Sequence, residues 1–101
     1  MPRALSVARV QVPPANEAEY LALLGELAVR LRSRGQSLWL FRHPERRDTF
    51  LEFSESATRD QHRSLVQQDE QETLLEARLR ALASYAGDAD DLWEEVSLGT
   101  H

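Results

Sequence analysis

The sequence predicts an α+β domain in which a four-stranded antiparallel sheet carries two helices on one face. Two apolar runs, residues 38–41 and 49–53, flank the polar turn HPERRD and predict a β-hairpin in the middle of the chain. A helical pattern lies on each side of this hairpin, and an alternating segment opens the chain. With a last strand at residues 92–98, the order of elements is the split βαββαβ arrangement.

The composition favours a single bacterial domain, residues 1–101, that works in the cytoplasm. The net charge of −5 leaves no basic stripe for nucleic acid, and no apolar run is long enough to span a membrane. Cysteine is absent, which excludes disulfides, thiol catalysis and iron–sulfur clusters. All 12 basic residues are arginine and isoleucine is absent, a codon bias typical of a GC-rich bacterial genome.

The first half of the chain predicts a strand followed by a helix. Residues 4–12 alternate, and Asn16 with Glu19 three positions later forms a capping-box pattern at the start of a helix. Gly35 is the expected helix end, and Gly25 in the middle is interpreted as tolerated rather than required by tight packing. The residues at helical spacing form one apolar stripe: Tyr20, Leu23, Leu24, Leu27 and Leu31.

A second helix is expected after the hairpin, with Ser54 or Ser56 as its cap. His62, Leu65 and Val66 would share one side of it, and residues 67–73 contain no apolar side chain, so the helix there is solvated or broken. An apolar face resumes at Leu74 and ends near Gly87. The final segment, residues 92–98, alternates and is interpreted as a strand, with a short helix as the alternative.

Two helices cover only one face of such a sheet, so the other face needs a partner. The face toward the helices is expected to contain Ala8, Val10, Val12, Leu38, Leu40, Leu51 and Phe53. The second face is expected to contain Leu5, Val7, Arg9, Trp39, Phe41, His43, Phe50, Glu52 and Trp93. Because its large aromatic side chains exceed the apolar surface that a monomer usually exposes, we expect a second copy of the chain to cover this face and form a homodimer.

The segment FLEFSESATRDQH, in this order of elements and chain length, resembles the dimeric α/β-barrel superfamily with its ferredoxin-like fold, especially the antibiotic-biosynthesis-monooxygenase-like domains. Glu52, Ser56, Ala57 and His62 match the family's run from the third strand into a His-bearing helix, with the spacing about one residue short. The resemblance implies a homodimer whose two sheets enclose a barrel, with a small-molecule pocket between the sheet and helices of each subunit. Members include cofactor-free oxygenases, haem-degrading enzymes, lactone isomerases and proteins of no known activity. The haem-degrading relatives carry a Trp where this chain has Glu52 and Phe53, which argues against haem.

His62 and Glu52 are the candidate catalytic residues. An imidazole could accept a proton from a phenolic substrate, and Glu52 could tune it or pair with Arg9 across the sheet, although a packing histidine and a structural ion pair are the alternatives. Candidate substrate-binding residues are Arg9, Trp39, Phe41, Phe50 and Trp93. No cofactor is expected, and three scattered histidines give no metal site. Two hypotheses follow: a cofactor-independent, monooxygenase-like or isomerase-like enzyme for an aromatic or polyketide-like small molecule, or a non-catalytic small-molecule-binding or structural dimer.

Overall fold

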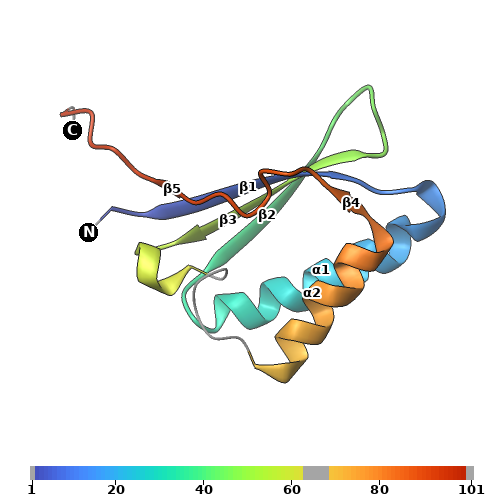
Figure 1. Ribbon diagram of the computed structural model, residues 1–101, viewed down its shortest axis with the longest axis horizontal. Helices are drawn as coiled ribbons and strands as arrows, with labels where there is room; N and C mark the ends of the chain where they lie inside the picture. Colours follow the sequence, from blue (N-terminus) through green and yellow to red (C-terminus); the bar gives the residue numbers. More distant parts are fainter. Residues whose placement is uncertain (1, 63–68, 100–101) are drawn as a thin grey trace.

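The computed structural model describes residues 2–62 and 69–99. In this part of the chain, a five-stranded antiparallel sheet carries two helices on one face (Figure 1). The elements in chain order are β1 (Ala4–Gln11), α1 (Glu17–Arg32), β2 (Ser37–Arg42), β3 (Thr49–Ser56), α2 (Glu70–Leu82), β4 (Ser84–Tyr85) and β5 (Trp93–Glu94), with 3-10 turns at Pro14–Asn16 and Arg59–Gln61. The strand order is β2-β3-β1-β4, and β5 also pairs with β1. The predicted α+β fold is therefore confirmed.

The predicted apolar stripe of α1 forms one side of the core. All five of its residues are buried against the sheet and α2, because their spacing places them on one face of the helix. Gly35 follows the helix with φ of 77°, in agreement with its predicted role at the helix end. The capping box is wrong: the Asn16 side chain makes no cap and instead donates to the carbonyl oxygen of Leu82 at the end of α2, at 3.0 Å.

The alternation of β1 and β2 was predicted on the correct faces, but that of β3 was inverted. Phe50 pairs with Val10 and Glu52 pairs with Ala8, so Phe50 and Glu52 point toward the helices and are each 2% exposed. Leu51 lies on the opposite, open face, as does Phe53. Both faces of β3 carry apolar side chains, and a shift of one residue exchanges the two sets, so alternation alone did not identify the inner one.

The second helix begins later than predicted. Ser54 and Ser56 belong to β3, and α2 starts at Glu70, where Asp69 Oδ1 accepts the backbone N–H of Glu72 at 2.8 Å. Leu65, Val66 and residues 67–68 of the charged run lie outside the described residues. The helix ends at Leu82 rather than near Gly87, because the chain enters β4 at once.

The edge of the sheet beside β1 is made of two short pieces. The prediction of a strand at residues 92–98 is confirmed for Trp93 and Glu94, which pair with Leu5 and Ala4, and β4 was not predicted. Tyr85 pairs with Val10 and Trp93 pairs with Leu5. The two edge residues are eight positions apart in the chain, whereas their partners on β1 are only five apart. Three extra residues therefore loop out between β4 and β5.

Candidate active site

Small and polar side chains occupy one end of the helix-facing side of the sheet. Ser6 on β1 pairs with Ser54 on β3, and Ser56 lies two positions further along the same strand face. All three are at most 6% exposed. This end of the sheet differs from the other end, where Val10 and Phe50 belong to the apolar core. Short hydroxyl side chains leave room for a polar group between the sheet and the segment 59–62 that covers it.

His62 fills part of that room and is 0% exposed. Its Nδ1 lies 3.0 Å from Ser56 Oγ, and its Nε2 lies 2.9 Å from Ser6 Oγ. The 3-10 turn Arg59–Gln61 places it there, and the side chain of Gln36 donates to the carbonyl oxygen of Gln61 beside it. In a neutral imidazole one nitrogen donates and the other accepts, so a proton could pass between imidazole and hydroxyl without movement of the backbone.

Glu52 lies on the same side of the sheet, with two tyrosine hydroxyls on one of its oxygens. Tyr20 Oη on α1 and Tyr85 Oη on β4 each donate to Glu52 Oε2 at 2.6 Å. Short bonds of this kind are typical of hydroxyls that donate to a charged acceptor, and they compensate for the burial of the carboxyl group. Sequence reasoning missed both tyrosines, since Tyr20 was counted only as part of the apolar stripe.

The tyrosine pair is supported by neighbouring aromatic and cationic groups. The Tyr20 ring lies 5.7 Å from the Phe50 ring, centroid to centroid, and the Arg80 guanidinium lies 4.5 Å above the centroid of Tyr85. Arg80 also binds Asp90 at 2.8 Å. These contacts hold both hydroxyls in position, because neither ring can rotate away without losing packing.

The predicted site residues divide between the two faces of the sheet. His62 and Glu52 lie on the helix side, and Phe50 lies in the core rather than in a substrate pocket. The open face carries the exposed side chains Arg9, Trp39, Phe41 and Trp93. The predicted Arg9–Glu52 pair is wrong. Successive residues of a strand point to opposite faces of the sheet, and Arg9 is paired with Leu51, so Arg9 and Glu52 lie on opposite faces.

The open face contains a hollow of about 440 Å³. Its lining residues are Leu5, Val7, Arg9, Leu51, Ala86, Asp88 and Trp93. Two of the predicted substrate-binding residues, Arg9 and Trp93, therefore share one hollow, but the sheet separates it from His62 and Glu52.

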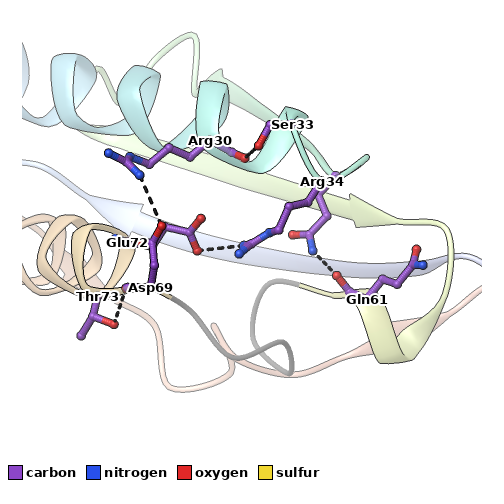
Figure 2. A network of polar contacts seen from close by, with 8 residues as sticks. Arg30, Ser33, Arg34, Gln61, Asp69, Glu72 and Thr73 are labelled. Carbon is purple, nitrogen blue, oxygen red and sulfur yellow. Dashed lines mark hydrogen bonds and ion pairs between the residues drawn. The ribbon is translucent and has the colours of Figure 1, made fainter.

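Polar residues join the end of α1 to the turn before His62 and to the start of α2 (Figure 2). Arg34 lies 2.9 Å from the buried carboxylate of Glu72, and Arg30 lies 3.5 Å from Asp69. These ion pairs connect α1 to the start of α2, while the Gln36–Gln61 bond connects it to the turn before His62. The position of His62 therefore depends on α1 as well as on β3.

Within residues 2–62 and 69–99, no three His, Asp or Glu side chains come together in a way that could hold a metal ion. No helix in that part of the chain is long and apolar enough to cross a membrane.

Several solved structures share this fold. SnoaB, a cofactor-independent oxygenase from Streptomyces nogalater, matches with a TM-score of 0.74 at 17% identity, over 99% of this chain and 97% of its own. The fold is that of the antibiotic-biosynthesis-monooxygenase-like proteins. A candidate antibiotic biosynthesis monooxygenase from Caulobacter crescentus has a TM-score of 0.74 at 16% identity, covering 95% and 92% of the two chains. Another from Chloroflexus aurantiacus has a TM-score of 0.68 at 19% identity, covering 100% and 97%.

The predicted resemblance is thus confirmed in fold, along nearly the whole chain. No family model matches the sequence, and no curated protein sequence is significantly similar to it.

Proposed function

We propose that the protein is a homodimeric, cofactor-independent monooxygenase-like enzyme that acts in the cytoplasm on an electron-rich aromatic or polyketide-like small molecule. The observation that carries this proposal is His62, buried with a serine hydroxyl at each ring nitrogen. The chain also shares its fold over 99% of its length with a cofactor-independent oxygenase. A proton acceptor is the group such chemistry requires from the protein, because a deprotonated phenol is electron-rich enough to react with oxygen directly.

The proposed reaction begins with removal of the phenol proton. The hydroxyl of Ser6 or Ser56 that donates to the neutral imidazole takes the substrate proton as it passes its own to His62. Molecular oxygen then oxidises the phenolate to a quinone. One oxygen atom enters the ring and the other leaves as water with two substrate hydrogens, so the substrate supplies all four electrons.

Glu52 would act as a positioning residue in this scheme. Its carboxylate holds the hydroxyls of Tyr20 and Tyr85 on the same side of the sheet as His62. Replacement by glutamine removes the charge and weakens both short bonds. We expect a smaller loss of rate from Glu52→Gln than from loss of the histidine, since no proton transfer is assigned to Glu52.

The homodimer is proposed from the open face of the sheet. Trp39, Phe41 and Trp93 are 46%, 57% and 57% exposed, and all three lie on that face. The Phe41 and Phe53 rings meet edge to face at 5.4 Å, which extends the aromatic surface across β2 and β3. A second copy of the same sheet is the partner that removes this surface from water on both subunits at once.

A non-catalytic, ligand-binding or structural dimer is the second candidate. The observation in its favour is that both nitrogens of His62 already have hydroxyl partners inside the protein. A histidine that only stabilises the packing of segment 59–62 against the sheet would have the same geometry.

Oxygen uptake with a panel of hydroquinones and hydroxylated aromatics distinguishes the two candidates. We expect His62→Ala to lower turnover by roughly 10²–10⁴-fold, the usual contribution of a positioned proton acceptor. Ser56→Ala should lower the rate while removing fewer atoms.

Two matched variants control for folding and for loss of polarity. Ser54→Ala changes a buried hydroxyl on the same strand face that has no hydrogen-bond partner in the described part of the chain. His43→Ala removes a histidine from the turn between β2 and β3. Both should retain activity, with melting temperatures measured for every variant. Equal rates for wild type and His62→Ala, or no oxygen uptake by any form, would favour the non-catalytic candidate.

A further inference from the structure

The hollow on the open face is built by the interruption between β4 and β5. The backbone N–H of Ala86 donates to the carbonyl oxygen of Arg9 at 2.9 Å, and that of Glu95 donates to the carbonyl oxygen of Arg3 at 2.8 Å. Between these two bonds the edge segment leaves β1 and loops outward. The loop is held in place, because Ala89 is buried in the core and Asp90 binds Arg80.

The backbone N–H and C=O groups of Val7 face this interruption. In an antiparallel sheet alternate residues direct both backbone groups to the same neighbour, and the carbonyl oxygens of Arg3 and Arg9 accept bonds from the edge segment. Val7 has the same parity, yet the backbone bonds from the described edge residues 84–95 go to other residues of β1. One N–H and one C=O are therefore directed toward the hollow.

Arg9 is the cation of the hollow. It forms no ion pair with any carboxylate in the described part of the chain, including Asp88, which lines the same hollow. Leu5, Val7 and Leu51 surround it with apolar surface, and Trp93 supplies an exposed indole. A guanidinium that has no carboxylate partner among residues 2–62 and 69–99, beside an aromatic wall, suits a ligand with one anionic end and one flat apolar end.

We propose that this hollow binds a planar aromatic carboxylate, with the carboxylate on Arg9 and the ring against Trp93. A volume of about 440 Å³ lies within the range of small-molecule sites, roughly 300–1,000 Å³. The site lies across the sheet from His62 and Glu52, so it stands independently of the proposed oxygenase reaction. In the homodimer the partner's sheet would lie over the hollow and enclose the bound ring.

Titration with 2-naphthoate, followed by tryptophan fluorescence and by calorimetry, tests this site. We expect saturable binding, and a loss of roughly 10- to 100-fold in affinity for Arg9→Gln, the usual effect of removing a charge-assisted hydrogen bond. Trp93→Leu should also weaken binding, and the neutral analogue 2-naphthamide should bind wild type about as weakly as the acid binds Arg9→Gln. Arg46→Gln, in the exposed turn after β2, is the matched control and should bind like wild type.

Several results would overturn the proposal. Absence of saturable binding at millimolar 2-naphthoate would mean that the partner's side chains fill the hollow. Equal affinity of wild type and Arg9→Gln, or of the acid and the amide, would remove Arg9 from the site. Binding lost in His62→Ala but retained in Arg9→Gln would place the ligand on the helix side of the sheet. Since Arg9 is exposed on the single chain, each subunit of the variant should fold, and its melting temperature tests this.

Discussion

Arg3 fastens the C-terminal segment to the sheet through its guanidinium. Its Nε and one terminal nitrogen bind the two carboxylate oxygens of Glu95 at 3.0 and 2.8 Å, and the other terminal nitrogen lies 3.3 Å from Glu55. The hydrogen bond from Arg3 lowers the pKa of Glu95 below its ordinary value of 4.5. The same pair raises the pKa of Arg3.

This pair should make stability depend on pH at acid values. A carboxylate whose pKa is lowered by folding stabilises the folded state above its unfolded pKa, and this contribution disappears as pH falls through the lowered folded pKa. Wild type should therefore be more stable than Glu95→Gln above pH 4.5, and the difference should decrease below pH 4.5 and vanish only once the pH lies below the lowered folded pKa of Glu95. Urea unfolding at stepwise lower pH measures this. Glu94→Gln removes the same charge from β5 and is the control; a deficit of Glu95→Gln that persists in acid would contradict the assignment.

At the level of residues, the sequence identified the chemical groups of the candidate site better than their surroundings. His62 and Glu52 were both named from the sequence, but Glu52 was predicted on the open face, whereas it lies on the helix side with His62. Their partners Ser6, Tyr20 and Tyr85 come from three other elements, and no local pattern links them to the pair. Only the register between strands reveals that Glu52 faces inward, and register is a property of pairing rather than of one strand.

Among the elements, α1 offers a direct test of its mid-helix glycine. A Cβ added at Gly25 would meet no heavy atom within 4 Å, in agreement with the interpretation that this glycine is tolerated. Gly25→Ala should therefore raise the free energy of unfolding by about 0.5–1 kcal/mol, because alanine loses less backbone entropy in a helix. Urea denaturation with unchanged m-value would measure it.

Gly35 is the matched control for that substitution. Its φ of 77° lies in the left-handed region, so Gly35→Ala should lower stability by about 1–2 kcal/mol although it too has open space for a Cβ. Destabilisation by Gly25→Ala would instead show that the groove beside it, bounded by Leu24 and Leu38, has to stay free of a methyl group.

Element boundaries were predictable where one pattern had no competitor. The stripe of α1 is long and strictly periodic, and it was predicted correctly. The start of α2 was not, because Ser54 and Ser56 have the residue type of a helix cap yet lie in a strand, where their small size admits His62. A strand of two residues such as β4 is too short to show any alternation.

For the whole molecule, the open face predicts self-association. We expect wild type to sediment at twice the chain mass of 11.5 kDa. Trp39→Asp would place an unpaired charge in a dry interface and should shift the protein to monomer or aggregate. Sedimentation equilibrium at micromolar concentration measures the mass. Leu74→Asp, at a residue 51% exposed on α2, is the control and should remain a dimer; a wild-type mass of one chain would contradict the model of association.

The looped-out residues between β4 and β5 also influence how the sheet can grow. A long, straight strand at the edge of a sheet offers its free backbone groups to any passing chain, whereas β4 and β5 are two residues each and are separated by a turn that contains Asp88, Asp90 and Asp91. This margin is too short and too strongly charged to accept a further strand in register. Growth sideways into a fibril is thereby discouraged beside β1, whereas the proposed homodimer would form through the broad face and close after two copies.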